Sequence, residues 1–227
     1  MPLPKRIEWV TFDVYGCLID WETGIYEAFE KEAAKDGLTV DREQLLAAFD
    51  ANQREVKQGP YELYAEVMRR TVIKTVEDLD WPLESARARF LPAALPTWPA
   101  FKDANPALKR LHKNFKLGLI SNIDDKLLGE SRRMVPVDFD LVVTGQQVRS
   151  YKPEWAHFKE FERRIGGKKG WVHIGSSYYY DVEPCLQHKI PVIWVNRDKQ
   201  KLESGQRKPT EEVKNLREAA KLLIPEK

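Results

Sequence analysis

The chain has 227 residues, of which 42% are hydrophobic and 32% are charged, and its net charge is only +2. This composition excludes a disordered or fibrous chain and argues against a dedicated nucleic-acid binder, which would gather positive charge along one face. Two cysteines, Cys17 and Cys185, are too few for a disulfide framework and stand in no metal-ligand spacing, so we expect a reducing, cytoplasmic compartment.

The first predicted element is a strand over residues 7–12, which follows an N-terminus without the apolar stretch of a signal peptide or membrane helix. A block without a strong strand comes next, and it reads as successive helices over residues 23–36, 42–58, 61–76 and 83–90. A proline-rich segment from Leu91 to Pro99 ends the block. We therefore predict a helical cap domain over residues 20–97, with a cleft beneath it that encloses a small molecule.

After the cap, short apolar runs alternate with helix-length segments. The predicted strands are 116–120, 139–143, 171–175 and 190–195, and the predicted helices are 106–114, 124–134, 154–165, 181–188 and 211–223. Strands that are apolar along their whole length are typical of a parallel sheet covered on both faces. The alternation predicts an α/β fold, a doubly wound parallel sheet with a Rossmann-like core built from residues 1–19 and 98–227.

Polar side chains follow four of the predicted strands. They are Asp13, the pair Ser121-Asn122, Lys152 in the loop before a helix, and the segment from Ser176 to Asp181. Each alone has an ordinary structural explanation, such as a helix cap, a turn or a surface lysine. Because the carboxyl ends of parallel strands line one crevice, together they would converge on one rim of the sheet.

These stretches, Phe12-Asp13-Val14-Tyr15-Gly16, Ser121-Asn122, Tyr151-Lys152-Pro153 and Ser176 to Asp181, resemble the four motifs of the haloacid dehalogenase superfamily, in the same order. The resemblance implies a Rossmann-like core and an aspartate nucleophile, Asp13, that forms a covalent ester. It further implies that Lys152 holds Asp13 ionised and that Asp181 helps to activate the hydrolytic water. By the same resemblance Ser121 binds the substrate carboxylate, Asn122 faces the departing halide, and Ser176 supports Lys152.

Two positions favour the 2-haloacid dehalogenase branch of that superfamily. Tyr15 stands where the phosphatases carry a general acid, and Ser176 stands where they tend to carry another acid. A halide leaves without protonation, and fewer carboxylates make a poorer Mg²⁺ site. We therefore expect a hydrolase, most consistent with an (S)-2-haloacid dehalogenase or a close relative, without cofactor or metal, acting on a small organic acid. A homodimer is expected by analogy with the family alone.

Two alternatives stay open. The first is a Mg²⁺-dependent phosphatase in which Asp13 and Asp181 hold the metal. The second is a catalytically silent protein that binds a ligand through its cap. Tyr15 and Ser176 argue against the phosphatase, and the joint presence of Asp13, Lys152 and Asp181 argues against the silent protein.

The sequence departs from the family pattern at three places. Cys17 replaces a usual threonine, and Tyr178 replaces an asparagine, so we expect its ring or a neighbouring tyrosine to line the cleft. In the cap, Asp50 stands near the place of a substrate-binding arginine, and Arg54, one helical turn later, is the predicted substitute. Tyr61 and Tyr64 are predicted to supply the aromatic wall of the cleft. The four histidines show no ligand clustering, and His173 is predicted to be a core residue.

Overall fold

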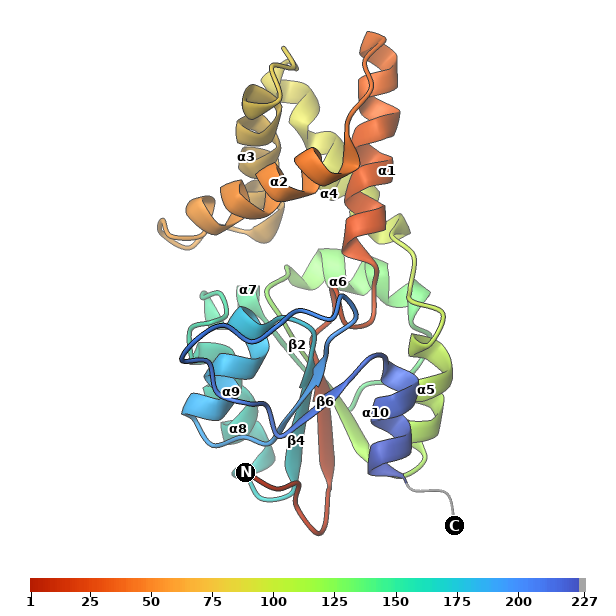
Figure 1. Cartoon of the computed structure of the whole chain (residues 1–227), viewed down its shortest axis with the longest axis vertical. Helices are drawn as coiled ribbons and strands as arrows, with labels where there is room; N and C mark the ends of the chain where they lie inside the picture. Colours follow the sequence, from red (N-terminus) through yellow and green to blue (C-terminus); the bar gives the residue numbers. More distant parts are fainter. Residues whose placement is uncertain (225–227) are drawn as a thin grey trace. The chain divides into compact units, whose positions relative to one another are not determined.

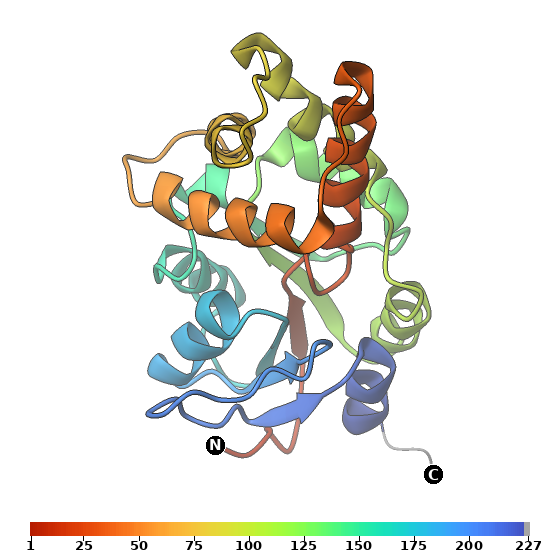
Figure 2. The same cartoon turned by 45° about the horizontal axis from the view of Figure 1, so that its top comes forward.

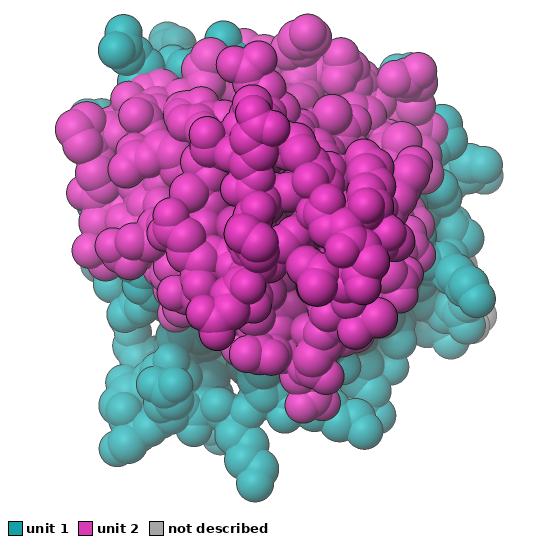
Figure 3. All heavy atoms as spheres, turned by 90° about the horizontal axis from the view of Figure 1, so that it is seen from above, with its two compact units in different colours: residues 1–19, 100–122, 135–227 teal, residues 20–99, 123–134 magenta. Residues whose placement is uncertain are grey.

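The structure is a computed structural model in which residues 1–224 are described. The chain forms two compact units, which Figure 3 shows in different colours. The sheet unit comprises Met1–Ile19, Ala100–Asn122 and Val135–Lys227, and the helical unit comprises Asp20–Pro99 and Ile123–Met134. The last three residues of the predicted core domain, 98–227, lie outside the described part.

The sheet unit contains a six-stranded sheet with the order β3-β2-β1-β4-β5-β6, in which every neighbouring pair is parallel (Figure 1). Its strands are β1 (Trp9–Phe12), β2 (Lys116–Ser121), β3 (Leu141–Thr144), β4 (Trp171–Gly175), β5 (Val192–Val195) and β6 (Glu211–Val213). β1 lies in the interior of the sheet, and β4 is fully buried along its whole length. The predicted doubly wound parallel sheet is confirmed.

Helices cover both faces of this sheet, with α8 and α9 on one face and α5 and α10 on the other (Figures 1 and 2). The helices of the sheet unit are α5 (Ala104–His112), α7 (Gly145–Val148), α8 (Ala156–Ile165), the π-helix η5 (Tyr178–Val182), α9 (Glu183–Gln187) and α10 (Leu216–Leu223). α5 buries Ala104, Ala107, Leu108 and Leu111, the spacing that turns one helical stripe to a core. Beneath α8, Phe158 and Phe161 pack on Trp171 of β4.

The helical unit has a core of its own, in which the ring of Phe29 packs edge-on against Phe49, Trp81 and Phe90. Its elements are α1 (Trp21–Ala33), η1 (Ala34–Asp36), α2 (Arg42–Val56), α3 (Tyr64–Asp78), η2 (Ser85–Arg89), α4 (Phe90–Ala94), η3 (Leu95–Thr97), α6 (Asp125–Ser131) and η4 (Arg132–Met134). Asp20 and Asp41 cap α1 and α2 by accepting from Thr23 N and Gln44 N. The first segment of the unit ends at Pro99, two residues later than the predicted cap domain, 20–97.

Residues 124–134 were expected to form a helix of the core, but the segment Ile123–Met134 belongs to the helical unit. The physical reason is Asp124, whose two carboxylate oxygens accept from Tyr64 N at 2.7 Å and Ala65 N at 2.9 Å. These amides open α3, so the carboxylate satisfies donors that a helix start otherwise leaves unpaired. Leu127 and Leu128 of α6 are buried as well. Asp124 thus has a structural part in this unit.

The predicted helix over residues 211–223 is wrong in its first part. Glu211–Val213 form β6 and pair with β5, and the helix α10 begins only after Asn215, whose side chain accepts from Glu218 N. A three-residue edge strand with two exposed glutamates carries too little apolar pattern to separate it from a helix. None of the helices in residues 1–224 combines the length and apolarity needed to cross a membrane.

Candidate active site

The strand order places a switch point between β1 and β4. The chain runs outward from β1 to β2 and β3 on one side, then returns to β4 on the other side of β1. In such sheets the crevice for ligands lies at the carboxyl ends of the strands that flank the switch point. Asp13 directly follows β1, and Asp181 lies in η5, the π-helix that follows β4. Both predicted acids therefore come from elements that flank this point.

Lys152 joins the two acids. Its Nζ donates to Asp13 Oδ1 at 2.8 Å and to Asp181 Oδ1 at 2.6 Å, and a third bond goes to the carbonyl of Ile120 at 3.2 Å. The side chains of Lys152 and Asp181 are 2% and 0% exposed, whereas that of Asp13 keeps 12%. Asp13, which lies more than a hundred residues before Lys152 and Asp181 in the sequence, thus joins them in one buried cluster and is its most exposed member.

Asn122 holds the backbone of Lys152. Its Oδ1 accepts from Lys152 N at 2.6 Å, and its Nδ2 donates to the Lys152 carbonyl at 3.2 Å. Both ends of the amide are therefore engaged by one residue of the neighbouring loop. The role that the resemblance implies for Asn122, facing the departing halide, stays a prediction, and the geometry adds that its amide fixes where the lysine side chain begins.

The two carboxylates differ in acidity although they share the lysine. Burial raises the pKa of Asp13 to about 6, an effect that the nearby Lys152 opposes and the negative charge of Asp181 increases. The pKa of Asp181 is lowered to about 2, because Lys152 and His173 outweigh the cost of burial. The two acids raise the pKa of Lys152 above its ordinary value. The cluster therefore holds an ammonium between two carboxylates of unequal proton affinity.

Asp181 is fixed from several sides. Its Oδ2 accepts from Ser177 N at 3.2 Å, and its backbone amide donates to the Ser177 carbonyl in the first turn of the π-helix. The side chain lies directly on Gly175, where a Cβ would come within 2.4 Å of Asp181 Cβ. A glycine is thus required at the end of β4 for the carboxylate to reach Lys152.

The loop after β1 turns tightly. Gly16 has φ of +97°, and its amide donates to the Ile19 carbonyl at 2.7 Å, so the chain folds back at once. Tyr15 lies in this turn and is half-buried. Cys17 is fully buried, and its Sγ lies 3.8 Å from the carbonyl of Ile174. Burial raises the pKa of this thiol well above its ordinary value, in line with a small buried side chain.

The two predicted serines lie at the carboxyl edge. Ser121 ends β2 and is buried. Ser176 follows β4, and its carbonyl accepts from Trp194 Nε1 at 2.9 Å.

Tyr178 was expected to have a part in lining the cleft, but its hydroxyl donates to the carbonyl of Arg207 at 2.9 Å and its ring packs edge-on against Trp194. This side chain belongs to the hydrophobic core of the sheet unit. The reason is the π-helix, whose first residue turns toward the β5 side.

Two predicted substrate-binding residues belong to the helical unit. Arg54 of α2 forms an ion pair with Asp50, Nη2 to Oδ2 at 2.8 Å, one turn earlier on the same helix. Both side chains are about half exposed, at 53% and 40%. Tyr64 begins α3, where its amide is held by Asp124. Arg54 and Tyr64 stay predictions, with the added observation that Arg54 already neutralises the acid that would repel an anionic substrate.

Three contributors to the site are absent from the sequence prediction: Thr11, His173 and Gly175. The predicted core position of His173 agrees with its full burial, but its Nε2 also lies 3.4 Å from Asp181 Oδ1. Thr11 Oγ1 lies 2.9 Å from the other ring nitrogen. A polar side chain inside each of two apolar strands, Thr11 and His173, is the sequence signal that could have revealed them.

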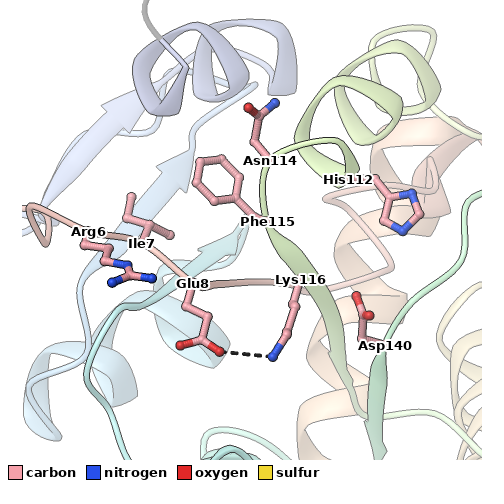
Figure 4. Close-up of a pocket in the computed structure, with 8 residues that line it drawn as sticks. All are labelled: Arg6, Ile7, Glu8, His112, Asn114, Phe115, Lys116 and Asp140. Carbon is pink, nitrogen blue, oxygen red and sulfur yellow. Dashed lines mark hydrogen bonds and ion pairs between the residues drawn. The ribbon is translucent and has the colours of Figure 1, made fainter.

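A pocket of about 510 Å³ lies at the other end of the sheet, lined by Arg6, Ile7, Glu8, His112, Asn114, Phe115, Lys116 and Asp140 (Figure 4). Glu8 precedes β1 and Lys116 opens β2, so this pocket is at the amino ends of the strands. Two of its charged side chains pair with each other, since Lys116 Nζ binds Glu8 Oε1 at 3.0 Å. The candidate active site therefore lies at the carboxyl ends of the strands and not in this pocket.

The fold places the chain in the class of α/β proteins with a doubly wound parallel sheet, and its candidate site is a buried cluster of two carboxylates and a lysine. Residues 7–188 match the haloacid dehalogenase-like hydrolases, and the chain belongs to that family. It is similar to the (S)-2-haloacid dehalogenases of Pseudomonas putida and Pseudomonas fluorescens, each 24% identical over 226 residues that cover 97% of this chain and 98% of the relative. The solved structure of L-2-haloacid dehalogenase from Xanthobacter autotrophicus with chloropropionic acid covalently bound has the same fold. Its TM-score is 0.84 at 19% identity, over 97% of this chain and 100% of that one.

Proposed function

We propose that this hydrolase removes halide from small (S)-2-haloacids through a covalent ester of Asp13. The observation that carries the proposal is the cluster at the switch point, where a partly exposed carboxylate is held by a buried ammonium. Tyr15 supports it, because no carboxylate stands two residues after Asp13 to protonate an alkoxide leaving group. The similarity to the two Pseudomonas enzymes, which are (S)-2-haloacid dehalogenases, points to the same substrate class.

In the first step, the Asp13 carboxylate displaces the halide. Lys152 binds Oδ1, so the attack is assigned to Oδ2, which forms a bond to carbon 2 while the carbon–halogen bond breaks with its electron pair. Displacement from the opposite side inverts carbon 2, so an (S)-substrate gives an (R)-2-hydroxy acid. The relative from Xanthobacter autotrophicus, which holds chloropropionic acid covalently bound, supports a covalent intermediate.

In the second step, water attacks the carbonyl carbon of the ester. Negative charge then develops on Oδ1, 2.8 Å from Lys152 Nζ, which would stabilise it as an oxyanion donor does. When the bond between Cγ and Oδ2 of Asp13 breaks, Oδ2 leaves as the hydroxyl oxygen of the product and the water oxygen stays on Asp13. One water proton goes to the product hydroxyl and the other is released to solvent.

The part of Asp181 in this proposal is to hold Lys152. The resemblance would make it the base for the hydrolytic water, but its side chain is 0% exposed and its pKa of about 2 makes it a weak base. Its 2.6 Å bond to Lys152 Nζ supports a positioning role instead.

A single turnover in ¹⁸O-labelled water tests the covalent mechanism. With enzyme in excess over (S)-2-chloropropionate, we expect the label in the Asp13 carboxylate and not in the first (R)-lactate, as measured by mass spectrometry of the peptide and the product. Asp13→Asn, nearly equal in volume, should fold normally and lose turnover by several orders of magnitude. Label that appears in lactate alone would rule out the ester.

We also propose that the reaction needs no metal. The observation is again Lys152, whose ammonium already bridges the two carboxylates that a Mg²⁺ ion would use in a phosphatase. Prolonged EDTA treatment should leave chloropropionate hydrolysis unchanged. Loss of activity with EDTA, restored by Mg²⁺ and accompanied by hydrolysis of p-nitrophenyl phosphate, would favour the phosphatase alternative.

A further inference from the structure

A column of buried polar side chains runs along the α8 face of the sheet and ends at the candidate active site. Thr11 of β1 and His173 of β4 are direct partners in the parallel register. Trp171 stands two residues before His173, so it points to the same face. All three side chains are fully buried. Polar side chains buried inside a sheet lose their hydrogen bonds to water, so they are normally hydrogen-bonded to another group of the protein.

The hydrogen bonds of this column have a fixed direction. Trp171 Nε1 can only donate, and it lies 2.8 Å from Thr11 Oγ1. The threonine hydroxyl can then give its own hydrogen to His173 Nδ1, 2.9 Å away. A ring nitrogen that accepts leaves the proton on the other nitrogen, Nε2, which lies 3.4 Å from Asp181 Oδ1.

The far end of the column requires the same arrangement. An ionised carboxylate can only accept, so Nε2 must carry a hydrogen in order to face Asp181. Burial lowers the pKa of His173, and the edge-on ring of Phe158 lies 5.2 Å away, centre to centre. The charged groups that act on the imidazole are Asp181 and Lys152. The ring is therefore a neutral N–H donor, oriented from both ends.

We propose that Thr11 and His173 are positioning residues that hold the Asp181 carboxylate as an oriented acceptor for Lys152. The inference rests on the proposed function, because it assigns to Lys152 the placement of Asp13 and of the developing oxyanion. Neither residue touches substrate. Their effect passes through Asp181 Oδ1, the atom that both His173 and Lys152 contact.

Matched substitutions separate this role from simple packing. His173→Leu removes the donor, whereas His173→Gln can return an N–H near the position of Nε2. Thr11→Val removes the hydroxyl at equal shape, and Thr11→Ser keeps it. With (S)-2-chloropropionate, we expect kcat to fall about tenfold or more in the Leu and Val variants. KM should stay within about twofold, and the Gln and Ser variants should recover most of the rate.

A second measurement does not depend on activity. Two-bond ¹H–¹⁵N spectra of the histidine-labelled protein, with His173 assigned through the Gln variant, should show neutral His173 protonated at Nε2, and Thr11→Val should move the Nδ1 signal. Protonation at Nδ1, wild-type kcat in His173→Leu, or equal losses in the Leu and Gln variants would overturn the proposal. If the wild type hydrolyses no haloacid, the proposed function fails, while the spectra still decide whether the column has this direction.

Discussion

At the residue scale, the chemistry of the site depends on how unevenly donors are shared between two carboxylates. Asp181 accepts from Lys152, from Ser177 N and from His173. Asp13 shares Lys152 and is otherwise opposed by burial and by the charge of Asp181. Two neighbouring acids whose proton affinities are driven apart can take separate roles at one pH. Here the more exposed carboxylate, Asp13, is also the more basic one, as the nucleophilic role proposed for it requires.

The raised pKa of Asp13 predicts the acid side of the pH profile. A nucleophilic carboxylate must be ionised, so kcat/KM should fall as the pH drops through about 6, the pKa of Asp13, and not near its ordinary 3.8. Activity falls toward acid pH because protonation below this pKa removes the attacking electron pair. The profile should be measured with (S)-2-chloropropionate from pH about 4 to 9, where the reference pKa values of carboxyl and imidazole groups fall.

The variant Asp181→Asn supplies the internal control for this profile. The negative charge of Asp181 raises the pKa of Asp13, so removing it should move the acid limb of the residual activity to lower pH. A limb that stays near 6 in this variant, or that lies near 4 in the wild type, would assign the titration to another group.

At the scale of elements, the junction between β4 and the π-helix η5 delivers Asp181 to the site. A π-helix is an uncommon turn that is often found at functional sites. In this one, Ser177 accepts backbone bonds from Asp181 N and Val182 N, and its side chain accepts from Tyr180 N. Gly175 lets the resulting loop press its acid against the end of the strand.

Gly175→Ala should therefore damage the site more than the fold. The new methyl group would meet the Asp181 carboxylate at 2.5 Å and push it from Lys152. We expect kcat to fall at least about tenfold, with a stability loss of roughly 1–3 kcal/mol from overpacking.

Kinetics and urea unfolding should be compared with Gly129→Ala in α6, where a methyl group meets nothing within 4 Å. That control should keep activity and gain up to about 1 kcal/mol of helix stability. Equal kinetics in the two variants would show that Asp181 does not need this close contact.

At the scale of the whole molecule, the sequence could predict the sheet and the positions of the acids and the lysine. The reason is that apolar runs identify parallel strands, and parallel strands bring their carboxyl ends together whatever the separation in sequence. The π-helix, the clamp by Asn122 and the hydrogen bonds that link Thr11 and His173 could not be predicted, although the two polar residues themselves stand out in their apolar strands. They depend on which strands are neighbours and in which register, as when β1 and β4 pair Thr11 with His173 across 162 residues.

The division of the chain into units could not be fully predicted from the sequence for a similar reason. Residues 123–134 have the length and apolar pattern of any helix between two strands, and only the bonds of Asp124 to α3 show where they belong. Asn122 and Asp124 stand two residues apart, yet the first holds Lys152 in the sheet unit and the second holds α3 in the helical unit. The chain crosses between the units at this point with an anchor on each side.

The anchor at Asp124 gives the final prediction. Its carboxylate pairs with the first amides of α3 through two charge-assisted bonds, so Asp124→Ala should lower the free energy of unfolding by about 1–2 kcal/mol. Asp124→Asn keeps one acceptor oxygen and should cost about half as much.

Asp41→Ala is the matched control, since Asp41 caps α2 through a single exposed bond to Gln44 N, and its effect should be smaller. Urea unfolding measures the free energy of unfolding of the three variants. Hydrogen exchange shows where the loss occurs, because the amides of Tyr64 and Ala65 should lose protection in Asp124→Ala. The amide of Lys152, which is held by Asn122, should keep its protection. Unchanged exchange at Tyr64 and Ala65 would mean that the start of α3 does not depend on this carboxylate, and that other contacts hold residues 123–134 in the helical unit.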